Sequence, residues 1–408
     1  MHLKIKIGRR RLEFGRRKKN NDASGFSGEI MLPQTLTAQE YRQNMQFVAG
    51  MRARDDSVVP QSCLCFLPYC CNLEAGGIKT IFLMLEALQK NCGTKLYINI
   101  YPPLATRDRE KDYEAAIRKK FPSLRFSLVQ PEEAGYVDIA VCTLWITAFE
   151  LAKFNRCKQK YYLVQDYEAL FYPSGSVAAL VDETYKFGFY GITNSTRLAE
   201  IYKGFSSSPV FRYYPGVDKS LYYPPAAKNF SKEQYSLIFY GRPSNQRNCF
   251  ELISLICRRI KDALKDKIEI ISVGEDYQPK DYRLDKIVCN KGRVCSMQKL
   301  AELYRRCDIG ISFITTPTFS YQHLEYMASG LCLVTNEQPG IADFVKDGEN
   351  AVVCPMIVSV IAERIIELVN NPAQMEFLSR NAVQTVRQFD WDNCGKSVCG
   401  FIGNKKTI

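Results

Sequence analysis

The sequence predicts an α/β fold made of two Rossmann-like domains that face each other across a cleft. The chain has 408 residues, whereas a single hydrophobic core usually stops growing near ~250–300 residues, so two domains are expected. Strand-like apolar runs alternate with helix-like runs along most of the chain, and this alternation is typical of parallel strands joined by crossover helices. The composition, 46% hydrophobic and 24% charged, is that of a globular protein with a substantial core.

The alternation occurs in two series that define the domain boundaries. A basic, polar leader over residues 1–55 comes first, and we expect it to be partly disordered. The N-terminal domain follows over residues 56–230 and the C-terminal domain over residues 231–408, with prolines and a polar stretch as the linker. Elements are expected at 37–51, 63–67, 78–90, 95–101, 112–120, 139–144, 148–154 and 161–165, and then at 237–240, 249–264, 268–273, 286–289, 297–306, 309–313, 324–329, 332–335, 351–354 and 357–370.

The net charge is +12, and the leader concentrates part of it. A block of like charges is usually a solvated tail, but it also attracts anionic lipid headgroups, so both interpretations stay open. Nucleic acid is not expected as a partner, because no nucleic-acid-binding module is recognisable. The leader lacks the apolar stretch of a secretory signal, and the longest apolar runs are far shorter than the ~20 residues that cross a bilayer. We expect a cytoplasmic protein, with peripheral contact at the inner face of the plasma membrane as an extension of this hypothesis.

The sixteen cysteines are expected to be reduced and mostly buried, because no secretion signal accompanies them. The densest group is Cys63, Cys65, Cys70 and Cys71, but its spacing differs from the paired C-x2-C of zinc sites, and packing in a strand is the favoured interpretation. Only two histidines are present. No metal site is predicted.

Glycines and arginines follow several of the predicted strands. Gly76 and Gly77 come after a strand and open a helix, where the backbone can approach a phosphate, although a tight turn is the alternative. Arg242 and Arg247 come just beyond the first strand of the second domain, a position that suits diphosphate recognition. Later strand ends carry further candidates for the same ligand. These strand-end candidates are Gly241, Asn248, Gly274 and Arg293.

The stretch Ser320–Gly330 is the most specific in the chain. Polar side chains, Ser320, Tyr321 and His323, precede or open a helix that carries Glu325. A carboxylate there can accept hydrogen bonds from ribose hydroxyls, and the backbone N–H groups of a helix start can face phosphate oxygens.

These motifs resemble the retaining GT-B glycosyltransferases of family 4. The resemblance rests on Gly216-Val217-Asp218 with Tyr222 and Pro224, on Gly241-Arg242, and on the Glu325 helix ending at Ser329-Gly330. More narrowly, the sequence is similar to WsaF-type rhamnosyltransferases over roughly residues 60–390. The residues that carry this narrower resemblance are Tyr162-Leu163-Val164-Gln165-Asp166-Tyr167-Glu168, Phe171-Tyr172-Pro173, Tyr240-Gly241-Arg242-Pro243 and Arg247-Asn248.

The chain departs from the wider family in two places. Where the family has the first glutamate of a Glu-x7-Glu pair, this sequence has Pro317, as WsaF-like enzymes do. The arginine–lysine clamp of the family is matched by Arg242 with Arg247 or Arg293, so the charge is kept and the lysine is not.

The resemblance implies a retaining glycosyltransferase that needs neither a metal ion nor a cofactor. It implies that a deoxyhexose, most simply rhamnose from dTDP-rhamnose, is transferred to a glycan or lipid-linked glycan acceptor. The product would be a precursor of a cell-surface polysaccharide. In this hypothesis the N-terminal domain holds the acceptor and the C-terminal domain the nucleotide-sugar donor. Arg242, Arg247 and Arg293 stabilise the leaving diphosphate. The donor-binding set is Gly76, Gly77, Gly241, Asn248, Gly274, Ser320, Tyr321, His323 and Glu325, and the sugar or acceptor contacts are Gln165, Asp166 and Tyr167.

Two alternatives stay open. Asp166 and Glu168 have the spacing of an Asp-x-Glu metal pair, but the WsaF-like resemblance explains them better as sugar or acceptor contacts. The chain could also be a catalytically inactive nucleotide-sugar-binding partner in a glycan-assembly complex. A dehydrogenase or epimerase is disfavoured, because G-x-G-x-x-G and Tyr-x3-Lys arrangements are absent.

Overall fold

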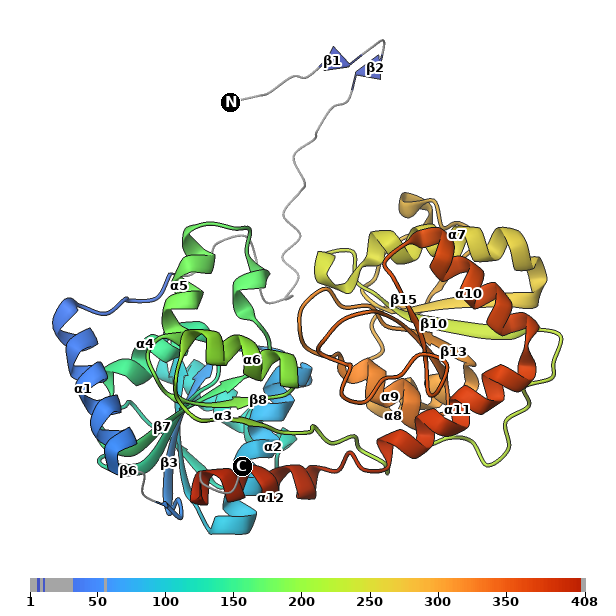
Figure 1. The fold of residues 1–408 in the computed structure, drawn as a ribbon. Coiled ribbons are helices and arrows are strands. Elements are labelled where there is room, and N and C mark those ends of the chain that lie inside the picture. Colours follow the sequence, from blue (N-terminus) through green and yellow to red (C-terminus); the bar gives the residue numbers. More distant parts are fainter. Residues whose placement is uncertain (1–5, 8–9, 12–31, 55–56, 405–408) are drawn as a thin grey trace.

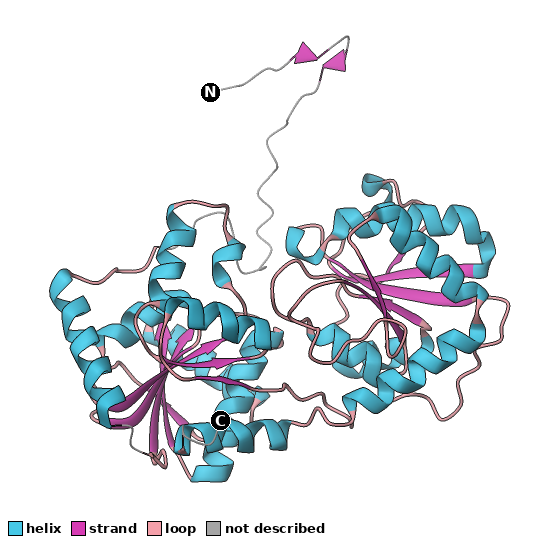
Figure 2. Ribbon diagram, viewed as in Figure 1, coloured by secondary structure: helices cyan, strands magenta, loops and turns pink. Residues whose placement is uncertain are grey.

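The computed structural model describes residues 6–7, 10–11, 32–54 and 57–404. It confirms two α/β domains, each a parallel sheet with helices on both faces (Figure 1, Figure 2). The disorder expected for the leader concerns mainly residues that lie outside the described ranges. In the described part of the leader, the short strands β1 (Lys6–Ile7) and β2 (Arg10–Arg11) pair with each other in antiparallel fashion.

The sheet of the first domain has seven strands in the order β5-β4-β3-β6-β7-β8-β9, and every neighbouring pair is parallel. The central strands are buried on both faces, as helices on both sides of a parallel sheet require. The strands are β3 (Ser62–Pro68), β4 (Lys95–Tyr101), β5 (Phe126–Leu128), β6 (Val137–Cys142), β7 (Cys157–Val164), β8 (Tyr190–Thr193) and β9 (Val210–Arg212). The helices between them are α2 (Gly76–Cys92), α3 (Arg107–Lys120), α4 (Trp145–Lys153), the 3-10 helix η1 (Glu168–Phe171), α5 (Ser176–Tyr185) and α6 (Thr196–Phe205).

The second domain repeats this architecture with six parallel strands in the order β12-β11-β10-β13-β14-β15. Two apolar clusters make up its core. Its strands are β10 (Tyr235–Gly241), β11 (Ile268–Gly274), β12 (Cys289–Asn290), β13 (Ile309–Ile311), β14 (Cys332–Asn336) and β15 (Val352–Cys354). Its helical elements are η2 (Gln246–Asn248), α7 (Phe250–Leu264), η3 (Lys265–Lys267), η4 (Pro279–Tyr282), α8 (Met297–Arg306), α9 (Tyr321–Ala328), α10 (Val358–Asn370) and α11 (Pro372–Val386).

Helix α1 (Ala38–Arg54) belongs to the first domain, although the sequence analysis placed its residues in the leader. It packs on α4 and β7 and buries Val48 and Met51 in the core of that domain. The side chain of Lys160 on β7 is fully buried beneath it and donates a hydrogen bond to Asn44 Oδ1 at 3.0 Å. A mostly polar helix is therefore anchored by a few apolar side chains and one buried ammonium group.

Helix α12 (Trp391–Gly403) also lies on the first domain, whereas the sequence boundaries assigned residues 231–408 to the second. It packs along α2, as Figure 1 shows beneath the first sheet. A side chain at Gly395 would collide with Ala87 of α2, so glycine permits the close crossing of the two helices. No element was expected at residues 391–403, so α12 is an addition to the predicted fold as well as a correction of the domain boundary.

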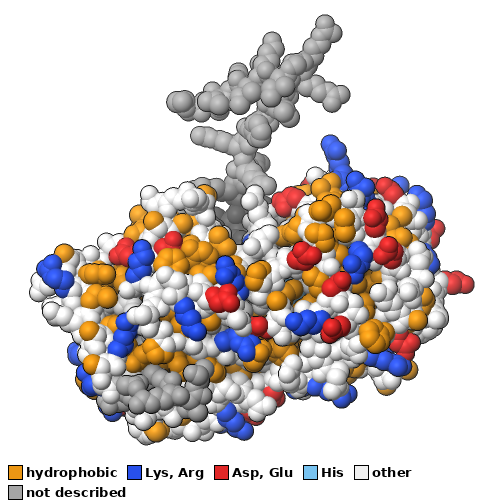
Figure 3. All heavy atoms as spheres, in the orientation of Figure 1, with side chains coloured by type: hydrophobic (Ala, Val, Ile, Leu, Met, Phe, Trp, Pro, Cys, Tyr) orange, Lys and Arg blue, Asp and Glu red, His pale blue; other side chains and the backbone are white. Residues whose placement is uncertain are grey.

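The surface of the molecule carries both signs of charge. On the face drawn in Figure 3, Lys and Arg side chains are interspersed with Asp and Glu over both domains. In the part of the chain that the structure describes, no helix has the length and apolar character needed to span a membrane. Cys63 and Cys65 are buried in β3, as expected from the strand pattern, while Cys70 is partly buried and Cys71 is exposed in the following loop.

Candidate functional site

The carboxyl ends of β10 and β11 lie side by side, and their backbones approach each other closely. Gly241 and Gly274 are paired across the two strands, and a Cβ on Gly274 would lie 2.6 Å from the carbonyl oxygen of Gly241. Gly274 also has a φ of +135°, which other residues rarely adopt. Directly after β10, the Nε of Arg242 lies 3.1 Å from Glu275 Oε1. A cation thus stands at the strand end predicted for it, and it is paired with a carboxylate.

Arg247, in η2, reaches across to the first domain. Its Nη1 lies 2.7 Å from Asp166 Oδ2, just beyond the end of β7, and its guanidinium stacks 4.7 Å from the centre of the Phe171 ring. Asp166 is only 7% exposed. It also accepts hydrogen bonds from the hydroxyl of Thr316, at 3.1 Å, and from the backbone N–H of Tyr167, at 2.8 Å. Burial raises the pKa of Asp166 to about 6, although Arg247 and these hydrogen bonds favour the charged form.

Glu168 points away from this site. It is 3% exposed, and its Oε2 accepts a hydrogen bond from the backbone N–H of Trp145, at the start of α4, at 2.7 Å. Burial raises the pKa of Glu168 to about 8. Asp166 and Glu168 therefore do not converge as the Asp-x-Glu spacing would require for a metal pair. More broadly, no group of three or more His, Cys, Asp or Glu side chains in the described part of the chain is arranged to hold a metal ion.

The start of α2 packs directly on the start of α9. A Cβ on Gly76, the first residue of α2, would lie 2.6 Å from the ring of Tyr321, the first residue of α9. The Tyr321 hydroxyl is hydrogen-bonded to Thr80. Gly77 lies beside Gln165, whose Nε2 donates to the Gly77 carbonyl at 3.0 Å. Two helix N-termini, one from each domain, therefore meet at the domain junction, and Tyr321 serves the packing of that junction.

Within α9, the predicted residues divide between the junction and the core. Ser320 caps the helix, as its polar character predicts. His323 is fully buried, and its ring nitrogens lie 3.0 Å from Ser320 backbone atoms and 3.0 Å from Thr335 Oγ1. Burial lowers the pKa of His323 to about 4. The imidazole thus holds the loop before α9 and does not face the cleft, where the sequence hypothesis had placed it as a donor contact.

Glu325 lies at the junction, partly exposed. Burial raises its pKa to about 7, and the positive charge of Lys79, on α2, acts in the opposite direction. Lys79 was not among the predicted site residues, because the sequence does not reveal which first-domain side chains face α9.

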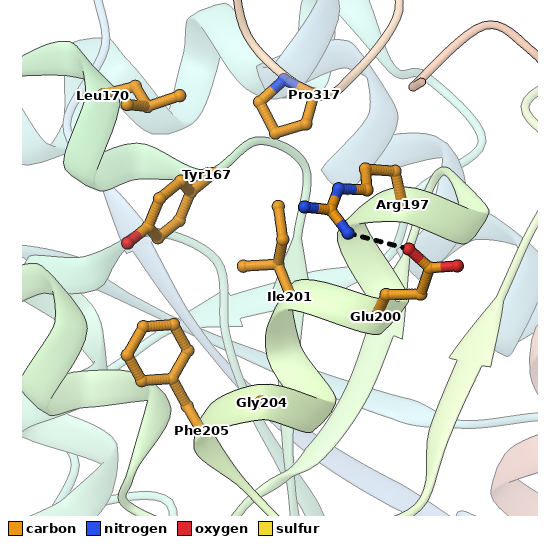
Figure 4. Close-up of a pocket in the computed structure, with 8 residues that line it drawn as sticks. All are labelled: Tyr167, Leu170, Arg197, Glu200, Ile201, Gly204, Phe205 and Pro317. Atoms are coloured by element: carbon orange, nitrogen blue, oxygen red, sulfur yellow. Dashed lines mark hydrogen bonds and ion pairs between the residues drawn. The ribbon is translucent and has the colours of Figure 1, made fainter.

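The loop before α9 is docked on the first domain by hydroxyl groups. Thr318 Oγ1 lies 2.9 Å from the carbonyl oxygen of Gln165, and Ser195 Oγ donates to the carbonyl of Pro317 at 3.1 Å. Pro317 thus occupies the place of the missing family glutamate and borders an open hollow of about 600 Å³ (Figure 4). Tyr167 forms another wall of this hollow, and its hydroxyl donates to Asp182 at 2.8 Å. The hollow is lined by Tyr167, Leu170, Arg197, Glu200, Ile201, Gly204, Phe205 and Pro317.

The structure thus brings most of the predicted residues to one region, and His323 is the exception. Arg242, Arg247, Gln165, Asp166, Tyr321 and Glu325 lie at strand ends or helix starts of the junction, and Asn248 follows Arg247 in η2. His323 is in the core. Arg293 is exposed in the loop after β12 and forms no ion pair within the described residues; the carbonyl of its neighbour Gly292 accepts a hydrogen bond from the N–H of Gly274 at 2.9 Å, so this loop lies beside the end of β11. Further interdomain contacts, such as Asp343 with Thr196 and Arg212, had no signal in the sequence.

Comparisons with known proteins agree with this geometry. Residues 235–366 match the model of the family described as "WsaF, C-terminal domain". The chain is 32% identical over 321 residues to the O-antigen biosynthesis protein RfbC of Myxococcus xanthus, a match that covers 78% of this chain and 25% of RfbC. The chain therefore spans about a quarter of the length of that relative.

Among solved structures, HepE of Anabaena, in complex with UDP, has a TM-score of 0.64 at 14% identity, over 83% of this chain and 99% of HepE. Sucrose-phosphate synthase of Thermosynechococcus elongatus has a TM-score of 0.61 at 13% identity, over 84% of this chain and 98% of the synthase. At such identities the likeness concerns the fold. Residues 235–366 thus resemble the C-terminal domain of WsaF, and the chain as a whole has the GT-B fold of these solved structures.

Proposed function

We propose that the chain is a retaining glycosyltransferase that transfers a deoxyhexose, rhamnose from dTDP-rhamnose, to a polysaccharide or lipid-linked glycan precursor. The observation that carries the proposal is the convergence at one junction of two helix starts, at Gly76 and Tyr321, with the cation Arg247 beside them. A helix start carries positive potential and free N–H groups, so this junction suits a doubly charged leaving group. The choice of rhamnose rests on the WsaF-like resemblance, and polysaccharide assembly is the role named for RfbC.

In this proposal the donor lies at the carboxyl ends of β10 and β11. Gly241 and Gly274 let these two strand ends pack closely against each other and against the rings of Tyr277 and Tyr240, and the carboxyl ends of parallel strands are where nucleotide-binding folds hold their ligand. Glu325 accepts hydrogen bonds from ribose hydroxyls, and Arg242 and Arg247 take the diphosphate. HepE, which shares the fold, has been solved with UDP and with UDP-glucose, which supports a nucleotide sugar as the ligand.

The arginines then act on the leaving group. As the bond from the anomeric carbon to the diphosphate breaks, negative charge grows on the diphosphate, and preorganised guanidinium groups stabilise that charge. We propose that they do so without a metal ion. The acceptor hydroxyl attacks from the face that the diphosphate leaves, so the anomeric configuration is retained.

The acceptor approaches from the first domain. The hollow between Tyr167, α6 and Pro317 borders the junction and combines aromatic, apolar and charged walls, which suits a sugar ring with its apolar face and polar edges. The basic leader is a candidate for contact with an anionic membrane surface that carries a lipid-linked acceptor.

A nucleotide-sugar-binding partner without activity is the second candidate. Pro317 favours it, because this residue stands where the wider family has a sugar-side glutamate, so the described site lacks one carboxylate of that family. The two candidates differ in turnover and not in donor binding.

The experiment is a donor screen followed by a transfer assay. We expect dTDP-rhamnose to raise the melting temperature more than UDP-glucose does, because a ligand that binds only the folded state stabilises it. With a rhamnose-accepting glycan, the product should keep the anomeric configuration of the donor by NMR. Arg242→Ala should lower kcat by about two to three orders of magnitude, whereas Arg259→Ala, at an exposed position on α7, should not change it. Donor binding without any product would support the inactive partner, and no stabilisation by any nucleotide sugar would refute both candidates.

A further inference from the structure

The ion pair between Arg247 and Asp166 joins the residue proposed to bind the diphosphate to a carboxylate of the other domain. The two charged groups are 2.7 Å apart, and the carboxylate is almost fully buried. A buried carboxylate and a diphosphate oxygen make the same demand on a guanidinium, namely a short charge-assisted hydrogen bond. Both cannot occupy the same N–H groups of Arg247 at the same time.

Asp166 is held in place independently of Arg247. The Thr316 hydroxyl and the Tyr167 backbone N–H both donate to its carboxylate. When Arg247 turns to another anion, Asp166 therefore stays where it is and loses the one ion-pair partner that it has among the described residues. This arrangement fits a role for Asp166 as a fixed carboxylate that holds the movable side chain of Arg247. It fits less well a role in which Asp166 moves to bind the sugar.

The pair also connects the domains. Asp166 follows β7 of the first domain and Arg247 belongs to η2 of the second. Thr316, in the loop before α9, adds a second link from the same carboxylate to the second domain. Breaking the Arg247 contact therefore weakens one side of the domain junction.

We propose that Asp166 is a placeholder anion: the diphosphate of the donor exchanges with the Asp166 carboxylate on Arg247, and this exchange couples donor binding to loosening of the domain junction. The inference rests on the proposed function. It makes Asp166 a positioning residue that keeps the guanidinium of Arg247 oriented until an anion of higher charge replaces the carboxylate. No covalent step is involved.

The exchange has a consequence for protons. The groups that face Asp166 are Arg247 and Thr316 from the second domain, the Tyr167 N–H, and the nearby Glu168 and Tyr185 side chains of the first domain. Without Arg247, no cation among these groups offsets the burial of the carboxylate. Burial already raises the pKa of Asp166, so donor binding should be accompanied by proton uptake near neutral pH.

The test compares anion binding to wild-type protein and to Asp166→Asn by titration calorimetry, with dTDP, UDP and inorganic pyrophosphate as probes. These probes contain no hexose, so a lost sugar contact cannot influence the result. Asparagine keeps the shape, and its single amide oxygen can still accept from the Tyr167 N–H, as Asp166 Oδ1 does. Its NH2 group takes the place of Oδ2 and can donate to the Thr316 hydroxyl, which reverses that hydrogen bond. Asparagine carries no charge that competes for Arg247. We expect Asp166→Asn to bind the probes about tenfold tighter, and to lose the proton uptake that wild-type protein shows when buffers of different ionisation enthalpy are compared.

Asp343→Asn is the matched control, because Asp343 also joins the domains, through Thr196 and Arg212, without touching Arg247. Equal tightening by Asp343→Asn would overturn the inference, since looser domains alone would then explain the gain. Unchanged or weaker binding of pyrophosphate by folded Asp166→Asn would also overturn it. If pyrophosphate binds tighter to Asp166→Asn but no nucleoside diphosphate binds to either protein, the placeholder stands and the proposed function fails. A double variant, Asp166→Asn with Arg247→Ala, should bind no tighter than Arg247→Ala alone.

Discussion

Replacing Glu168 by glutamine tests whether this carboxyl is a structural acid or part of the site. Its side chain is enclosed in the first domain, where it accepts a hydrogen bond from the N–H of Trp145 at 2.7 Å and lies 3.5 Å from the Tyr162 hydroxyl. No cation pairs with it among the described residues. A buried carboxyl in such surroundings is more stable in its neutral form, which glutamine resembles in shape and charge.

The size of the effect follows from the pKa of Glu168. Burial raises this pKa from 4.5 to about 8, so the folded state holds a proton that the unfolded chain has released. The stabilising contribution is complete below about pH 4.5 and is lost as the pH rises through 8. At ~1.4 kcal/mol per pKa unit, the loss between about pH 5.5 and about pH 8.5 is at most about 3 kcal/mol. For a domain of this size, about 3 kcal/mol corresponds to roughly 6–12 °C in Tm.

The assay is thermal unfolding of wild-type and Glu168→Gln protein across this pH range. We expect the Tm of the variant to gain on that of the wild type as the pH rises, because only the wild type loses the contribution of Glu168. Replacing Glu168 also removes its repulsion of the Asp166 carboxylate, which favours the variant in the same direction at high pH. Glu132→Gln, at an exposed position before β6, is the control and should follow the wild type. Parallel Tm curves for Glu168→Gln and wild type would refute the reasoning, and a loss of turnover with unchanged stability would return Glu168 to the site.

Three further predictions concern the junction and the core. Gly76→Ala should destabilise the protein by about 1–3 kcal/mol, because its Cβ would overlap the Tyr321 ring; the penalty should shrink in a Tyr321→Leu background, and an equal penalty in both backgrounds would contradict the packing argument. Lys160→Met should lower the free energy of unfolding by about 2–4 kcal/mol and increase hydrogen exchange in α1, because the side-chain oxygens of Asn44 and Asn155 lose their hydrogen-bond donor. Unchanged exchange would show that α1 does not depend on this ammonium group. His323→Ala should lower the Tm but leave the dissociation constant for dTDP within about twofold, since the imidazole faces the core; a large loss of affinity would restore it as a donor contact.

The alternation of strands and helices could be predicted because each element is long enough to show its own period. The longer strands, such as β3 and β11, were expected within a residue or two of their observed bounds. The short strands β13 and β15 were expected as well. No element was expected between residues 166 and 236, so α5, β8, α6 and β9 escaped, as did the three-residue strand β5. Helices α11 and α12 were not expected at all. Helix α1 was expected, but its packing on the first domain was not, because the surface that covers it is distant in the chain.

At the site, the sequence predicted residues by their place at strand ends and helix starts, where parallel sheets bind ligands. This reasoning located Arg242, Arg247 and Glu325 at the junction. It could not predict that Arg247 pairs with Asp166, 81 positions away, or that Lys79 faces Glu325. Such pairings depend on how the two domains are docked, and a single sequence has no local pattern that encodes the docking. His323 shows a different limit of sequence-based prediction. A polar residue at a helix start can cap the helix or bind a ligand, and the sequence does not distinguish the two roles.

Asp166 and Glu168 show why spacing alone could not decide the chemistry of the Gln-Asp-Tyr-Glu stretch. Two carboxylates one residue apart point the same way in an extended strand, which is the geometry that a metal pair needs. Here β7 has already ended, and Glu168 begins a 3-10 turn. The turn sends Glu168 into the core, toward the start of α4, and leaves Asp166 at the junction with Arg247. One stretch therefore supplies two carboxyl groups with different roles. The fold keeps Glu168 neutral, whereas Asp166 is an anion that holds Arg247 until a diphosphate replaces it. Glu168→Gln and Asp166→Asn separate these roles. Glu168→Gln should change the pH dependence of stability, and Asp166→Asn should change the affinity for pyrophosphate.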